Sequence, residues 1–261
     1  MTRILNAALV VLILALVAMP VQAAEALRIA AAADLKFCMD ELLAGFRASR
    51  AGADVEVTYG SSGNFKTQIQ QGAPFDLYFS ADIAYPRELI VANLALPPVQ
   101  PYAVGRIVLW SAQLDASRMT LDDLKAAQVR RIAIAAPQHA PYGKRAEEAL
   151  RAAGLWEQVQ PKLVFGENVA QAAQFVQSGN AQVGIIALSL ALSPELARQG
   201  GYCLIPESLH APLEQGFVMT RRAAGNSLSQ AFADYVVRQE ARAIMARYGF
   251  VLPDAAAGRT P

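Results

Sequence analysis

The chain has 261 residues, with 23 basic and 22 acidic side chains and a formal net charge of +1. This balance argues against nucleic acid or an anionic membrane surface as the partner, because both attract strongly basic proteins. Beyond residue 24 the sequence has no long apolar run, no low-complexity tract and no block of charge, and its length suits one large or two modest domains.

Residues 1–24 have the pattern of a cleavable signal peptide. Arg3 precedes an apolar run at residues 5–17, and small residues follow, so we expect cleavage after Ala23 or Ala24. The apolar run is short for a membrane span. No cysteine stands at the cleavage site, so we expect a periplasmic protein without a lipid anchor.

Cys38 and Cys203 are the only cysteines. In an oxidising compartment they could pair, but a buried free thiol at Cys38 is an equally good interpretation, because this residue lies on an apolar helix face. Histidines at metal-ligand spacing are absent from the sequence, so a zinc or copper site has little support.

Strands and helices alternate along the rest of the chain. A buried-type strand at 27–33 leads through Asp34 into a helix at 35–47, and an alternating strand at 54–59 leads into a helix at 65–71. Further strands are expected at 76–82, 106–111, 131–135, 162–165, 182–186, 201–205 and 216–220, and further helices at 121–127, 142–153, 169–177, 227–237 and 240–248. This order predicts an α/β protein with mostly parallel sheets and helices on both faces.

The segment Gly60-Ser61-Ser62-Gly63 joins the second strand to its helix. Helix N-termini carry unpaired N–H groups and partial positive charge, glycine lets a ligand approach the backbone, and serine adds hydroxyl donors. The alternative interpretation is an ordinary strand-to-helix turn. The anion interpretation gains support from a similar unit ending at Asp34, because both helix starts would lie at the carboxyl edge of one parallel sheet, where ligands bind.

Residues 105–210 repeat this pattern of a strand, a small or polar loop and a helix, with helix starts at Tyr142 and Val169. We therefore expect two lobes with a ligand cleft between them. Residues 25–104 with 211–261 would form lobe I, and residues 105–210 would form lobe II.

In combination and order, several motifs resemble the periplasmic solute-binding proteins of the molybdate/tungstate type, the capture components of ABC importers. These motifs span most of the mature chain: Ala31-Ala32-Ala33-Asp34-Leu35, Gly60-Ser61-Ser62-Gly63, residues 71–77, Ser80-Ala81-Asp82, residues 137–143, Glu167-Asn168-Val169 and Arg247-Tyr248-Gly249-Phe250. The resemblance implies a type II periplasmic-binding-protein fold that closes over a dehydrated tetrahedral oxyanion.

The same resemblance implies the ligand-binding residues. Ser62 would donate its hydroxyl and N–H, and Tyr142 and Val169 would donate backbone N–H groups. Asp34 stands where the family usually has a serine, and Ala187 where many members have a tyrosine, so both positions lose a hydroxyl donor. The hydroxyl of Tyr142 could replace the one that is missing at Ala187.

Asp34 is the larger departure. An ionised carboxylate about 4 Å from a dianion costs roughly 8 kcal/mol, twice about 4 kcal/mol per unit pair at an effective dielectric constant near 20. Three interpretations follow: Asp34 caps its helix by accepting from Lys36 or Phe37 N–H, Lys36 or Lys66 neutralises it, or it contacts the ligand directly. In the third case the ligand would be a cationic or protonated solute, or an oxyanion whose own metal expands its coordination.

Ser61, Lys36, Lys66 and His139 are candidates for a supporting role around the site, although solvated lysines and a loop-stabilising histidine are the simpler interpretations. The resemblance thus implies a non-enzymatic, monomeric receptor without a cofactor. It would carry a small oxyanion, with molybdate or tungstate as the first candidates, to an ABC permease.

Two alternatives remain at this point. The same receptor fold could bind another oxyanion, a metal cation or a small organic acid, because Asp34 and Ala187 alter the site. An exported hydrolase would use Ser61 or Ser62 with His139, but the loop is not a Gly-x-Ser-x-Gly nucleophile elbow.

Overall fold

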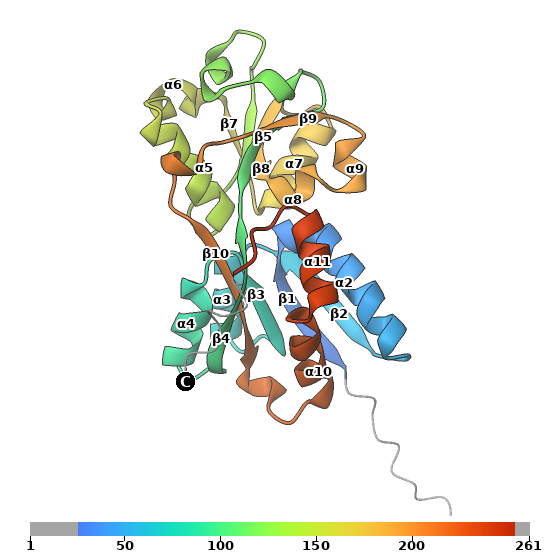
Figure 1. Cartoon of the computed structure of the whole chain (residues 1–261). Coiled ribbons are helices and arrows are strands. Elements are labelled where there is room, and N and C mark those ends of the chain that lie inside the picture. The colour runs from blue at the N-terminus through green and yellow to red at the C-terminus, as the bar shows by residue number, and fades with distance from the viewer. Residues whose placement is uncertain (1–25, 254–261) are drawn as a thin grey trace, which may run out of the picture.

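Two five-stranded sheets organise the protein into two lobes, as the computed structural model shows for residues 26–253 (Figure 1). The predicted signal peptide lies outside these described residues. Lobe I holds the sheet β2-β1-β3-β10-β4, whose strands are β1 (Leu27–Ala32), β2 (Val55–Gly60), β3 (Leu77–Ser80), β4 (Ala95–Gly105) and β10 (Leu213–Thr220). Lobe II holds the sheet β7-β6-β8-β5-β9, whose strands are β5 (Ile107–Ser111), β6 (Ile132–Ala135), β7 (Leu163–Gly166), β8 (Val183–Ala187) and β9 (Gly201–Leu204).

Both sheets are mixed. In lobe I, β1 runs parallel to β2 and β3, whereas β10 is antiparallel to β3 and β4. In lobe II, β6 runs parallel to β7 and β8, whereas β5 is antiparallel to β8 and β9. The predicted two-lobed α/β fold is confirmed, and the sheets contain more antiparallel pairs than the sequence suggested, because β5 and β10 each follow a connection that arrives from the other lobe.

Lobe I buries both faces of its sheet, as the alternation of side chains along β1 requires. Ile29 and Ala31 pack on one face with α2 (Lys36–Ser49), α10 (Ser227–Val236) and α11 (Gln239–Arg247), and Ala30 packs on the other with α3 (Ser62–Gln70) and α4 (Ala84–Val91). The short 3-10 helix η1 (Ala33–Leu35) joins β1 to α2.

Lobe II has one large core around its sheet, with Trp110 fully buried. Its helices are α5 (Pro141–Ala152), α6 (Trp156–Val159), α7 (Val169–Gln177), α8 (Leu188–Ala191) and α9 (Pro194–Ala197). Four further 3-10 helices lie in lobe II or in the connections to lobe I: η2 (Ala116–Arg118), η3 (Leu121–Lys125), η4 (Gln160–Lys162) and η5 (Glu207–Leu209); a fifth, η6 (Arg221–Ala223), follows β10.

The lobes are joined by extended segments rather than by a hinge helix (Figure 1). β4 continues through Arg106 into β5, and the chain returns from β9 to β10. The Arg106 guanidinium donates to the Gly249 carbonyl at 2.8 Å, and Val104 and Val251 form an antiparallel bridge, so the C-terminal segment is fastened beside the crossing strands.

The sequence did not predict β4, which contains Pro97, Pro98 and Pro101. Proline cannot donate to a sheet ladder, but β4 is an edge strand, where that loss is tolerated. Cys38 is buried and Cys203 partly exposed, and both thiols are free, so they do not pair in this structure. No helix within residues 26–253 is both long and apolar enough to cross a membrane.

Candidate functional site

The first turn of α3 begins in the segment Gly60-Ser61-Ser62-Gly63, and almost all of its N–H groups donate to an acceptor within the protein. Ser61 is the N-cap, since its hydroxyl oxygen accepts from Asn64 N–H at 3.3 Å. The Gly63 N–H donates to the His139 carbonyl of lobe II at 2.9 Å. Of the donors in this turn, the Ser62 N–H alone has no acceptor among residues 26–253, so it remains available to a ligand.

The Ser62 side chain is oriented for donation. Its hydroxyl oxygen accepts from the Ala81 N–H at 3.0 Å, and its carbonyl accepts from the Tyr78 hydroxyl at 2.7 Å. Because a hydroxyl can accept and donate at once, the Ser62 O–H proton is still free to bond an anion. Ser62 is 1% exposed, so water competes little for this donor.

Two helices of lobe II, α5 and α7, each begin with one N–H group that is available to a ligand. In α7 the Asn168 side chain accepts from Ala170 and Gln171 N–H at 3.0 Å, which leaves the Val169 N–H without a partner in the described part of the chain. In α5 the first helical residue is Pro141, which has no N–H, so the first donor available is that of Tyr142.

These three helix starts surround one small cavity between the lobes. It is lined by residues of both lobes: Ala32, Ala33, Asp34, Gly60, Ser61, Ser62, Ala81, Ala140, Pro141, Tyr142, Asn168 and Val169. It holds about 190 Å³ of space between atoms, part of it continuous with solvent. Lysine and arginine side chains do not line it, so helix N-termini and hydroxyl groups supply its positive potential.

Asp34 lines this cavity and is 1% exposed. Its Oδ2 accepts from the Tyr142 hydroxyl at 3.0 Å and from Gln215 Nε2 at 2.8 Å, and Gln215 Nε2 also donates to the Tyr142 hydroxyl oxygen at 3.1 Å. Its Oδ1 is buried and has no partner. Burial raises the pKa of Asp34 to about 6, although the hydrogen bonds from Gln215 and Tyr142 lower it.

Two of the three interpretations of Asp34 find no support in the structure. Its carboxylate accepts no hydrogen bond from the N–H of Lys36 or Phe37 in the described part of the chain; the backbone groups that lower its pKa are its own N–H and that of Leu35 in η1. Lys36 pairs with Asp40 at 3.5 Å and Lys66 with Glu88 at 2.6 Å, so neither lysine neutralises Asp34. The direct-contact interpretation stays as a prediction.

The other predicted residues divide between the cavity and its surroundings. Ser62, Tyr142 and Val169 line the cavity with Asp34, as does Ser61. Ala187 is buried at the end of β8 and is not among the lining residues. The Tyr142 hydroxyl bonds Asp34, so it does not replace a hydroxyl at Ala187.

His139 contributes through its backbone, because its carbonyl accepts from Gly63 while its ring Nε2 lies 3.1 Å from the Glu167 carbonyl. The ring therefore has no serine partner, and neither Ser61 nor Ser62 is set up as a nucleophile.

Sequence reasoning missed Gln215 and Asn168. Gln215 is fully buried on β10, and the only available signal was a glutamine in an apolar strand. Asn168 could have been found, since asparagine just before a predicted helix is a preferred N-cap.

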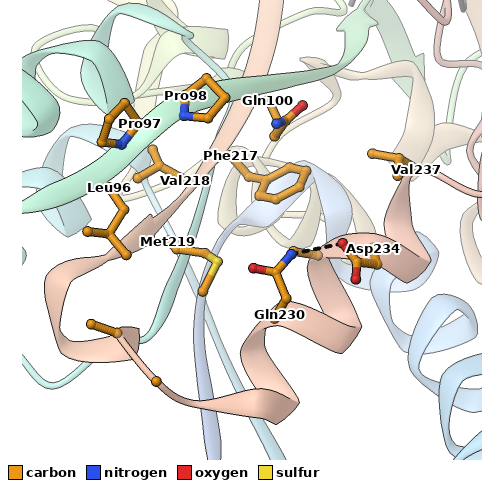
Figure 2. A pocket seen from close by; sticks show the side chains of 13 residues that line it. Leu96, Pro97, Pro98, Gln100, Phe217, Val218, Met219, Gln230, Asp234 and Val237 are labelled. Atoms are coloured by element: carbon orange, nitrogen blue, oxygen red, sulfur yellow. Dashed lines mark hydrogen bonds between the residues drawn. The ribbon is translucent and has the colours of Figure 1, made fainter.

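A second groove lies on lobe I, between β4, β10 and α10, away from the cleft (Figure 2). Apolar side chains dominate its lining, and Gln230 donates to Asp234 at 2.8 Å inside it. An anionic side chain without a cluster of N–H donors disfavours an anion there, so the interlobe cavity is the better candidate.

The fold and the cavity define a class: a two-lobed solute-binding protein that holds a small ligand between its lobes. The profile of the bacterial extracellular solute-binding protein family matches residues 27–251. The molybdate-binding protein ModA of Rhodobacter capsulatus is 37% identical over 77% of this chain and 79% of its own length, and that of Azotobacter vinelandii is 35% identical over 91% and 94%.

The solved structure of the periplasmic molybdate-binding protein of Azotobacter vinelandii superposes with a TM-score of 0.81 at 32% identity, covering 87% of this chain and 100% of that one. The chain therefore belongs to the bacterial extracellular solute-binding protein family, and within it to the group of the ModA proteins. It is a solute receptor and not an enzyme.

Proposed function

We propose that this protein captures a small tetrahedral oxyanion, molybdate or tungstate, between its two lobes. The observation that carries the proposal is the convergence of three helix starts, at Ser62, Tyr142 and Val169, on one small interlobe cavity that no cationic side chain lines. Helix N-termini favour anions through unpaired N–H groups and the helix dipole. The names of the relatives support the choice of molybdate.

Selectivity would come from the size of the anion and from the direction of the hydrogen bonds, because the site donates and the ligand must accept. N–H groups fixed at helix starts suit one radius of anion, and a smaller sulfate cannot reach donors from both lobes equally well. A protonated phosphate presents a donor where Ser62 and the backbone also donate, so its binding is disfavoured.

We further propose that the mature protein is periplasmic, released by a cleavable signal peptide without a lipid anchor, and that it delivers its ligand as a monomer to an ABC permease. Support for this comes from the pattern of residues 1–24 and from the extracellular family. Lobe I would comprise residues 25–104 with 211–261, and lobe II residues 105–210, a division with which the two sheets agree.

The test is calorimetry on the mature protein with molybdate, tungstate, sulfate and phosphate, with divalent cations as a further series. We expect molybdate and tungstate to bind with a Kd of about a micromolar or below, a free energy near −8 kcal/mol or better, and sulfate to leave the protein unchanged. Binding of a cation or an organic acid, together with no binding of any oxyanion, would overturn the proposal.

A further inference from the structure

Asp34 combines three properties that an ordinary structural carboxylate does not have. It lines the interlobe cavity, it is 1% exposed, and its two oxygens are treated differently by the protein. Oδ2 accepts two hydrogen bonds, from Tyr142 of lobe II and from Gln215 of β10, whereas Oδ1 has no partner. A buried polar atom without a partner is rare in native structures and calls for a ligand or a proton.

No cation offsets the charge of this carboxyl group among the described residues. Arg28 pairs with Glu56, Lys36 with Asp40 and Arg145 with Glu148, and no cation is among the groups that shift the pKa of Asp34. α7 and α8, which pack against η1, carry no charged residue at all.

The titratable groups that face Asp34 are neutral ones. They are Cys38 from α2, Tyr102 from β4 and Tyr142 from α5, and burial raises the pKa of each above its ordinary value. From β2, Tyr59 donates its hydroxyl proton to Asp40 rather than to Asp34, and Glu56 is itself an anion, paired with Arg28. An ionised Asp34 would thus meet a bound dianion with nothing between them to screen the repulsion.

We propose, building on the proposed function, that Asp34 binds the oxyanion as a neutral carboxylic acid. Oδ2 serves as the carbonyl oxygen that Tyr142 and Gln215 hold in place, and the Oδ1–H donates to an oxygen of the anion. The proton is taken from solvent, so the capture of one anion is accompanied by the uptake of one proton. Asp34 in this way supplies the hydroxyl donor that a serine would supply at the same position.

The direction of the pH dependence follows from the pKa of Asp34, which is higher in the anion complex than in the free protein. In the absence of an anion, burial outweighs the hydrogen bonds from Gln215 and Tyr142 and raises the pKa of Asp34 to about 6, and a neighbouring dianion stabilises the protonated form further. The complex therefore keeps the proton while free Asp34 loses it above about pH 6. Affinity is greatest below that pH and falls by about tenfold for each pH unit above it, for as long as the bound acid stays protonated.

The experiment is calorimetry with molybdate between about pH 6 and about pH 8.5, where the anion itself is fully ionised, repeated in two buffers that differ in ionisation enthalpy. We expect the Kd of the natural protein to rise about tenfold per pH unit and the buffer dependence to report about one proton taken up. Asp34→Asn is the matched variant, since its carboxamide keeps the shape and one donor but cannot titrate. It should bind with a Kd that is independent of pH and take up no proton.

Tight molybdate binding by the natural protein with no pH dependence and no proton uptake would overturn this inference and leave the proposed function intact. Failure of both the natural protein and Asp34→Asn to bind any oxyanion at any pH would overturn the proposed function itself. A preference for phosphate over molybdate would overturn both, because an ionised Asp34 would then be accepting the proton of the ligand.

Discussion

The contact between Gly63 and His139 allows closure of the lobes to be tested with one methyl group. Gly63 lies in the first turn of α3, and its N–H donates to the His139 carbonyl of lobe II. In Gly63→Ala the added Cβ would lie 2.6 Å from that carbonyl oxygen and 3.0 Å from the His139 Cα. Both are backbone atoms, so no change of rotamer relieves the clash and the lobes must move apart.

The two states respond in opposite directions. With the lobes separated, alanine in α3 is favoured over glycine by about 0.5–1 kcal/mol, because it loses less backbone entropy in a helix. With the lobes closed, the interlobe hydrogen bond, about 1 kcal/mol, is lost, and donors of lobe I and lobe II no longer reach one anion together. The gain in helix stability is common to both arrangements and cancels in the Kd, so the lost hydrogen bond of about 1 kcal/mol predicts a Kd at least about fivefold higher, and the backbone clash adds to this.

The assay is calorimetry with molybdate beside thermal unfolding of the unliganded protein. Gly63→Ala should weaken binding while the unliganded Tm stays the same or rises. Gly201→Ala in β9 is the control, since the nearest atom to its added Cβ, the Ser117 nitrogen, lies at 3.6 Å, an ordinary contact. If Gly63→Ala binds molybdate as tightly as the natural protein, the lobes do not close in the arrangement described here.

Four further substitutions distinguish residues that contact the ligand from residues that support the site. Ser62→Ala removes a donor to a charged ligand and should raise the Kd roughly 10- to 100-fold, whereas Ser61→Ala removes only the N-cap of α3 and should lower the Tm by about 2–4 °C with little change in Kd; the reverse pattern would contradict the assignment. Tyr142→Phe deletes the hydrogen bond to Asp34 across the lobes and should raise the Kd about fivefold by calorimetry, and an unchanged Kd would show that this bond does not favour closure. Asn168→Ala should cost about 1 kcal/mol in denaturant unfolding, because two N–H groups of α7 lose their acceptor, and equal stability would refute its capping role.

Local patterns predicted most of the elements. The helix expected at 169–177 has the bounds of α7, and the helix expected at 142–153 differs from α5 by one residue at each end. Apolar periodicity and capping residues act within a few positions, so a single sequence contains them. β4 was missed because its prolines oppose a strand locally, and only its place at the sheet edge makes them acceptable.

Part of the cavity was also foreseeable. Small residues between a strand and a helix predicted an anion site at Gly60-Ser61-Ser62-Gly63, and the family resemblance implied Ser62, Tyr142 and Val169, which the structure brings together. Gln215 was not foreseeable, because it lies 181 positions from Asp34 and reaches it only through the pairing of β10 in the first sheet.

By itself, the sequence determined which backbone donors exist: Asn168 and Ser61 cap their helices, and Pro141 leaves Tyr142 as the first donor of α5, because capping depends on neighbours a few residues away. Only the tertiary structure decided what Asp34 does. The donors on Oδ2 come from Tyr142 and Gln215, which are distant from Asp34 in the chain, and the ionisation of a carboxyl group depends on all the groups around it in space.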